Sequence, residues 1–125
     1  MFEEIDPRSP TPLYEQIAAR IRVAVATSEL NPGESLPSVR RLASTIRINP
    51  ATVVQAYRDL EKEGFVEMRH GAGTFVREVA ADHRTKVRAN QAMRLVGALV
   101  SDAARLGISV DEIGAAFEKV AGATR

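Results

Sequence analysis

The stretch RHGAGTF, residues 69–75, brings two glycines together with an arginine and a histidine. Glycine-rich turns hold phosphate groups in many nucleotide-binding proteins, but such a loop needs a strand before it and a helix N-terminus after it. Here Thr74–Arg77 has strand character, and both the third glycine of GxGxxG and the lysine of a P-loop are missing. We favour the interpretation that residues 70–73 connect the two strands of a β-hairpin, where glycine permits positive φ.

Other combinations of residues give little sign of catalysis. The sequence has no cysteine, and its two histidines stand too far from other ligand types for a metal cluster. No paired carboxylates or Ser/His/Asp set suggest an active site, and Glu61, Lys62 and Glu63 are expected to form a solvated helix end. We therefore expect no enzyme activity, no metal and no cofactor. A small nucleotide-dependent enzyme built on the glycine turn is the alternative, which nucleotide binding would support.

Length and composition suit one compact domain with a small appendage, since the chain has 125 residues of which 45% are apolar. The first residues, MFEEIDPRSP, lack the basic start and apolar run of a signal peptide, and no window approaches the ~20 apolar residues of a membrane span. We expect a soluble, cytoplasmic protein with no membrane partner. The net charge is only +1, but residues 38–77 carry seven basic against four acidic side chains.

Start and stop signals predict three helices ahead of the hairpin. Thr11-Pro12 predicts the start of the first, because a capping hydroxyl precedes proline and apolar residues then recur every four positions. Ser38 is the predicted N-cap of a second, short helix, and Asn49-Pro50 opens a third over 50–63. A hairpin over 65–77 follows. This order is that of a winged helix-turn-helix, in a fold that is mostly α with a small β-hairpin.

Residues 12–76 also carry motifs in the order of a known family: PLYEQIAARI, PGESLPSVRRLA and INPATVVQAYRDLEKEGFVEMRHGAGTFV. Together they resemble the N-terminal domain of the GntR family of bacterial transcription regulators. The form NPATVVQAYRDLEKEG and the short tail resemble the YtrA-type branch, whose members carry a small helical dimerisation tail in place of a large effector-binding domain. The resemblance implies a winged helix-turn-helix DNA-binding domain over 1–78 and, in this branch, a repressor often associated with transporter operons.

A helix that enters the major groove must present small, hydrogen-bonding residues in its first turn, so that its backbone approaches the base edges. The predicted third helix meets this requirement. Thr52 and Gln55 are candidates for base or phosphate contacts, and the Ala51 methyl group is a candidate for contact with a thymine methyl. Asn49 is a candidate for DNA contact too, although a helix cap is its commoner role.

Basic residues and the hairpin tip complete the predicted DNA-binding set. Arg40 occupies the place after LPS where an arginine contacts DNA in the family; a solvated surface charge is the alternative, and it is the favoured reading of Arg41. The residues Arg69, His70 and Gly71 resemble the family's wing tip, which touches the minor groove or the backbone beside it.

Two positions depart from the family pattern. Arg47 lies in the helix-turn-helix link, where a glycine is usual, so we expect a non-glycine residue in the left-handed conformation at a cost of about 1 kcal/mol. A phosphate contact by Arg47 would offset part of this cost. Ser28-Glu29-Leu30 replaces the common SGEL, which concerns loop geometry rather than function.

The segment 79–125 is predicted to form two amphipathic helices, separated at Gly107, with a capping box of Ser109 and Glu112 before the second. Two such helices cannot bury their apolar faces against each other alone. They pack either onto the winged-helix domain or, as we prefer, against a second copy, which lets two short reading helices contact the half-sites of a palindrome. The predicted dimerisation residues are Leu95, Val96, Leu99, Val100, Leu106, Ile113 and Phe117.

The sequence therefore predicts a homodimeric, sequence-specific regulator that binds a palindromic operator in double-stranded DNA through helix 50–63 and the wing 65–77. A winged-helix protein-interaction module without DNA specificity is the alternative, because the fold does not dictate the function. Such a module would tolerate the loss of Arg40 and His70. The tail is small, poor in aromatic residues and without convergent polar groups, so it indicates no enclosed effector pocket.

Overall fold

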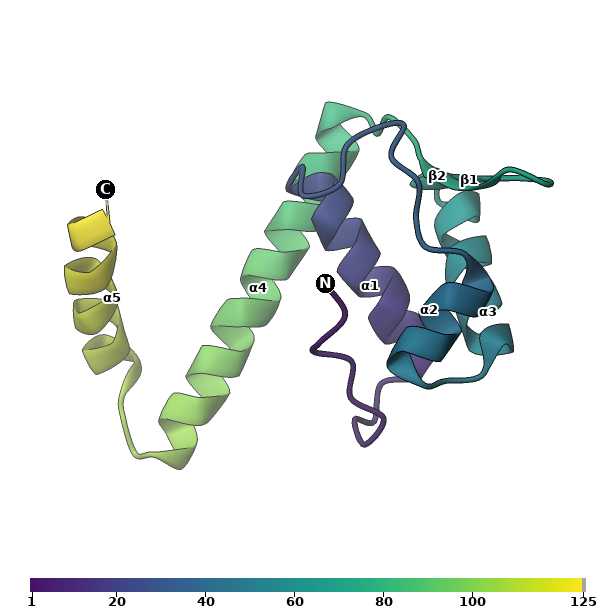
Figure 1. Ribbon diagram of the computed structural model, residues 1–125. Coiled ribbons are helices and arrows are strands. Elements are labelled where there is room, and N and C mark those ends of the chain that lie inside the picture. Colours follow the sequence, from purple (N-terminus) through teal and green to yellow (C-terminus); the bar gives the residue numbers. More distant parts are fainter. Residues whose placement is uncertain (125) are drawn as a thin grey trace. The chain divides into compact units, whose positions relative to one another are not determined.

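The computed structural model describes residues Met1–Thr124; Arg125, the last residue of the predicted dimerisation segment, lies outside the described residues. The chain is mostly helical with one small hairpin, which confirms the predicted fold class (Figure 1). The helices are α1 (Leu13–Ala26), α2 (Val39–Ile46), α3 (Pro50–Lys62), α4 (Ala81–Arg105) and α5 (Val110–Thr124), and the strands are β1 (Val66–Arg69) and β2 (Gly73–Val76). Two compact units, Met1–Arg88 and Ala89–Arg125, divide the chain and are described separately.

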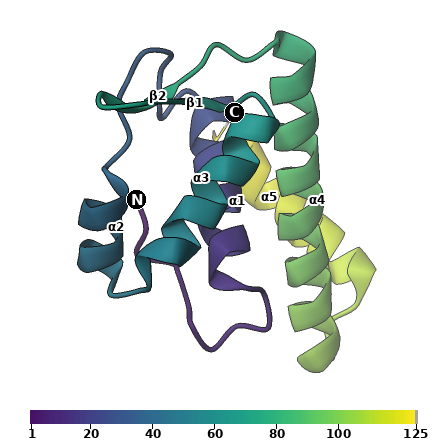
Figure 2. The ribbon, with the colours of Figure 1, turned by 90° about the vertical axis from the view of Figure 1, so that its right-hand side faces the viewer.

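The buried apolar residues of the first unit form a single core. Its first helix, α1, packs against α3, α2 packs against α3, and the hairpin follows the C-terminal end of α3 (Figures 1 and 2). Burying one Leu- or Phe-sized side chain stabilises a fold by roughly 1.5–3 kcal/mol, so a shared core is what holds these short helices together. The largest fully buried side chains are Tyr57, Phe65, Ile17, Ile21, Leu42, Leu60, Val53 and Val66.

The start of α1 differs from the prediction. Pro12 occupies the N-cap position, and no side chain caps the first turn, so the predicted role of the Thr11 hydroxyl is wrong. Gln16 ties down the preceding segment instead. Its Nε2 donates to the carbonyl oxygens of Thr11 at 2.8 Å and Asp6 at 2.9 Å, and its Oε1 accepts from the Asp6 N–H at 2.8 Å.

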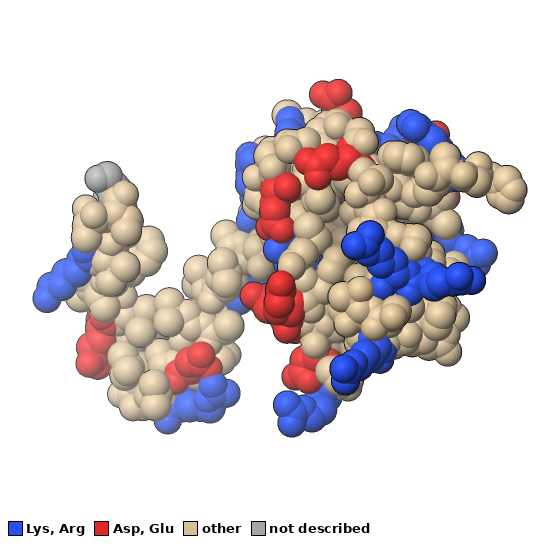
Figure 3. Space-filling model, in the orientation of Figure 1, with Lys and Arg blue, Asp and Glu red and all other residues tan. Residues whose placement is uncertain are grey.

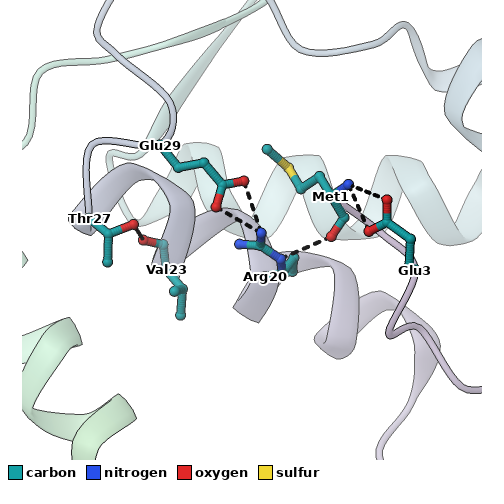
Figure 4. A network of polar contacts seen from close by, with 6 residues as sticks. All are labelled: Met1, Glu3, Arg20, Val23, Thr27 and Glu29. Atoms are coloured by element: carbon teal, nitrogen blue, oxygen red, sulfur yellow. Dashed lines mark hydrogen bonds and ion pairs between the residues drawn. The ribbon is translucent and has the colours of Figure 1, made fainter. Parts of the chain in front are cut away.

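The chain on both sides of α1 is also held by one arginine (Figure 4). Arg20 donates through Nε to the carbonyl oxygen of Met1 at 2.9 Å and through one terminal nitrogen to both carboxylate oxygens of Glu29, at 2.8 and 2.9 Å. Glu29 follows Ser28, which has φ of 62° although it is not a glycine. The ion pair thus fixes the turn in which this left-handed residue stands.

The hairpin is tighter than predicted. The two strands are antiparallel with Arg69 opposite Gly73, so the connection spans residues 70–72 and Gly73 belongs to β2. Gly71 and Gly73 have φ of 75° and 120°, which confirms that the turn uses conformations open to glycine. The wing therefore ends in a three-residue tip.

A further segment extends the hairpin on the other edge of β2. Gly33 donates its N–H to the Val76 carbonyl, Val76 donates to the Glu34 carbonyl, and Leu36 donates to the Thr74 carbonyl, each at 2.8 Å. The strand β2 thus lies between β1 and the residues that lead into α2. The base of the wing and the start of α2 are fixed to each other by backbone hydrogen bonds.

The second unit contains most of α4 and all of α5. Gly107, with φ of 72°, follows the end of α4. The predicted capping box is confirmed, because Ser109 Oγ accepts from the Glu112 N–H at 3.1 Å and Glu112 Oε1 accepts from the Ser109 N–H at 3.2 Å. No residue of α5 is buried. Among the described residues, no helix is both long enough and apolar enough to cross a membrane.

Candidate nucleic-acid interface

The first turn of α3 is capped by a side chain and presents small groups outward. Asn49 Oδ1 accepts from the Ala51 N–H at 2.9 Å, which confirms that Asn49 is the N-cap, and Pro50 occupies the first turn without the loss of an intrahelical hydrogen bond. Ala51 and Gln55 are exposed and Thr52 is half-buried. The surface of the first two turns therefore combines a methyl group, a hydroxyl and an amide, as a major-groove contact requires.

Exposed arginines lie on α2, which packs against α3. Ser38 Oγ caps α2 by accepting from the Arg41 N–H at 3.1 Å, which places Arg40 and Arg41 in the first turn of that helix. Neither of them, nor Arg47, forms an ion pair with any residue from Met1 to Thr124. In Figure 3 basic side chains gather over the region of α2. Their charge is thus not compensated by the protein and is available for phosphate.

Arg47 ends α2 in the left-handed conformation, with φ of 58° and ψ of 53°, as the sequence predicted. Its side chain is exposed at the turn between α2 and α3. For a residue with a Cβ this conformation costs roughly 1–2 kcal/mol. The cost is tolerated here because the backbone N–H groups of Arg47 and Ile48 both donate to the Ala43 carbonyl, Ile48 at 3.0 Å.

The wing carries one cation, Arg69, that contacts neighbouring side chains, and its tip is exposed. The guanidinium carbon of Arg69 lies 4.6 Å from the centre of the Phe75 ring, and the same side chain is 3.3 Å from a Glu67 carboxylate oxygen. Stacking on the ring fixes the direction of Arg69. The side chain of His70 and the backbone at Gly71 are exposed at the tip.

Two side chains of α3 connect it to the elements on either side. The Tyr57 hydroxyl donates to the Pro37 carbonyl at 2.7 Å, just before α2, and Glu61 Oε2 accepts from the Met68 N–H of β1 at 2.7 Å. Burial raises the pKa of the Tyr57 hydroxyl above its usual value. The helix α3 thus holds both α2 and the wing in place. Sequence reasoning missed these contacts, since spacing along the chain does not indicate them.

The C-terminal end of α3 is exposed, as predicted, but not merely solvated. The guanidinium of Arg22 on α1 donates twice to the Glu63 carboxylate, at 2.7 Å in both cases, and once to Glu15 at 3.3 Å. The hydrogen bond to Glu63 raises the pKa of Arg22 above its usual value. The pair fixes the end of α3 to α1, away from the first turn that carries the small polar groups.

Residues 13–76, from α1 through β2, match the family model of bacterial regulatory proteins of the gntR family. The chain belongs to the GntR family. Over 110 residues it is 37% identical to the HTH-type transcriptional repressor YtrA of Bacillus subtilis (strain 168), a match that covers 88% of this chain and 85% of that protein. This confirms the resemblance seen in the sequence.

Solved structures of GntR-family regulators share the fold over most of the chain. A GntR family transcriptional regulator from Listeria monocytogenes is 29% identical, with a TM-score of 0.68 over 91% of this chain and 97% of that one. YtrA from Sulfolobus acidocaldarius, a GntR-family transcription factor, is 36% identical, with a TM-score of 0.59 over 75% of this chain and 99% of that one. The protein is accordingly a transcription regulator with a DNA-binding helix-turn-helix, and its family is not one of enzymes.

Proposed function

We propose that this GntR-family regulator is a homodimeric repressor that binds a palindromic operator in double-stranded DNA through α3 and the wing. The observation that carries the proposal is the capped first turn of α3, with its exposed methyl and amide groups, flanked by arginines that have no acidic partner in the described residues. A small polar turn enters the major groove, and unpaired cations neutralise phosphates beside it. Repression is proposed because the similar Bacillus subtilis protein is named a repressor.

Each predicted DNA-binding residue has a distinct role in this proposal. Residues of α3 contact base edges, since their groups are the ones that differ between base pairs in the major groove. Cations contact phosphates, which positions the helix without reading sequence. The base-contacting residues are Ala51, Thr52 and Gln55; the phosphate-contacting residues are Arg40, Arg47 and Arg69; Asn49 positions α3 as its cap; and His70 with Gly71 approaches the minor groove or the backbone beside it.

The C-terminal helices supply the dimer contact, with residues 1–78 as the DNA-binding domain and 79–125 as the dimerisation segment. Six of the seven predicted interface residues are between 40% and 73% exposed, and Ile113 is half-buried. Four of them, Leu95, Val96, Leu99 and Val100, lie on α4 at spacings of one and three residues, so they form a stripe along one side of the helix. Exposed apolar stripes of this length are typical of interaction surfaces, and a two-fold axis would pair the stripe with its copy.

Selection of binding sequences from a random duplex library, repeated at two salt concentrations, tests the proposal. A two-fold palindrome whose enrichment falls steeply at higher salt is expected, because each phosphate contact releases counterions. Recovery of no sequence motif at either concentration would contradict it and favour a winged-helix protein-interaction module. Because a bacterial regulator must reach its operator DNA, we also propose that the protein is cytoplasmic.

A further inference from the structure

One hydrogen bond on the exposed side of α3 links Gln55 to an acidic residue. Gln55 Nε2 donates to Asp59 Oδ1 at 2.9 Å, one helical turn further along. Gln55 is exposed and Asp59 is half-buried. The Asp59 carboxylate forms no ion pair with any of the residues Met1–Thr124. Its only side-chain partner there is the amide of Gln55.

The chemistry of this pair fixes the direction of the amide. A carboxylate at neutral pH only accepts hydrogen bonds, so the nitrogen of Gln55 must face Asp59 and the oxygen must face away. If the amide turned over, its oxygen would meet the carboxylate and the hydrogen bond would become a repulsion. One N–H and the Oε1 of Gln55 therefore remain free for an outside partner.

This remaining pair of groups matches one base better than the others. Adenine presents an acceptor, N7, beside a donor, the N6 amino group, and glutamine pairs with both at once. Guanine presents two acceptors, N7 and O6, so the oxygen of a fixed Gln55 amide would face an acceptor there. Holding the amide in one direction thus favours adenine and disfavours guanine.

We infer that Asp59 is a positioning residue that fixes the Gln55 amide for recognition of an adenine in each half-site, an inference that rests on the proposed function. A pair of this kind also slightly stabilises an isolated helix. Helix stabilisation alone does not account for a carboxylate at Asp59, however. A negative charge on the helix that approaches DNA is repelled by the phosphates and weakens binding to any duplex. Selectivity for one base offsets that penalty.

The test compares base preferences of the full-length protein and three variants by selection from the same random duplex library. In Asp59→Asn the new amide either accepts from or donates to Gln55, so the direction of Gln55 is no longer fixed. We expect the preference for adenine over guanine at one position of each half-site to fall about tenfold. Binding to all duplexes rises at the same time, because one negative charge is removed. Gln55→Ala should lose the same preference at the same position.

The control is Glu78→Gln, which removes an exposed carboxylate after β2 rather than on α3. It should raise binding to all duplexes and leave every base preference unchanged. Thermal melting of each variant verifies folding. A wild-type motif that keeps its adenine preference in Asp59→Asn would overturn the inference and leave the proposed function intact. Absence of any wild-type motif would instead overturn the proposed function, and this inference with it.

Discussion

The N-terminal unit and the C-terminal helices carry apolar residues with the same helical period. Only in the N-terminal unit are most of these residues buried by the chain itself. In the N-terminal unit Ile17 and Leu60, from α1 and α3, are fully buried. On the C-terminal helices Leu95 and Phe117 are 64% and 57% exposed. Helical periodicity therefore identifies the side of a helix that is to be covered, but not what covers it.

The difference has a physical cause. In the N-terminal unit α1, α2 and β1 each pack against α3, so their apolar side chains share one core. A pair of helices offers each stripe a single partner, which covers only part of its width. The first unit thus buries its own apolar side chains, whereas most large apolar side chains of α4 and α5 beyond Arg88 are exposed. The substitutions that follow test this contrast.

The largest expected effect comes from the same substitution made in each region. Phe65 is fully buried and its ring lies 4.9 Å from that of His83, so Phe65→Ala should lower the free energy of unfolding by about 3–5 kcal/mol. Phe117→Ala should leave the unfolding of the N-terminal unit unchanged. Both tyrosines, Tyr14 and Tyr57, belong to that unit, so tyrosine fluorescence during urea unfolding reports on it alone. An equal decrease in the free energy of unfolding for both variants would contradict the difference between the two regions.

Self-association should depend on the exposed stripe of α4. Leu99 is 43% exposed in the single chain, and Leu99→Glu would place a carboxylate in the proposed dimer interface. An unpaired buried charge is strongly unfavourable, so dimerisation should weaken by about 2–4 kcal/mol. Sedimentation velocity over a range of protein concentrations measures this. Ser101→Glu, two residues along the same helix and on its other side, is the matched control and should remain dimeric; dissociation of both variants alike would argue against a specific interface.

DNA affinity should depend on the N-terminal unit without altering assembly. Arg40→Ala and Thr52→Ala should each weaken specific binding by about 1–3 kcal/mol while the dimer stays intact. Arg40→Ala should also reduce the salt dependence, because a phosphate contact is lost, whereas Thr52→Ala should not. Fluorescence anisotropy with the selected duplex measures both quantities. Arg41→Ala, a neighbouring exposed arginine, is the comparison; normal binding by the first two variants would show that the assigned residues are wrong.

The smallest effects concern the two non-glycine residues with positive φ, Ser28 and Arg47. Ser28→Gly and Arg47→Gly should each stabilise the N-terminal unit by up to about 1 kcal/mol, because glycine adopts this conformation without a Cβ clash. Only Arg47→Gly should also weaken DNA binding, since it removes a cation next to α3. Urea unfolding and anisotropy on both variants separate the two effects. Unchanged DNA binding by Arg47→Gly would remove Arg47 from the interface.

The sequence predicted the order of the elements and several of their ends. The caps at Ser38 and Asn49 and the capping box before α5 act between residues at most three apart, so their residue types suffice to predict them. The left-handed conformation of Arg47 was predicted from the family resemblance, because a glycine is usual at this place in the family. The candidate DNA-binding residues were predicted too, because they belong to contiguous motifs.

The contacts that hold these elements together could not be predicted from the sequence. The pairing of Leu36 with β2, the hydrogen bond from Tyr57 to the Pro37 carbonyl and the contact between Glu61 and the Met68 N–H join residues that no periodic pattern relates. The hydrogen bond between Gln55 and Asp59 lies within one helix. A spacing of four residues permits such a bond but does not show that it forms. These contacts depend on side-chain direction and on how helices cross, and both are set by packing of the core rather than by local preference.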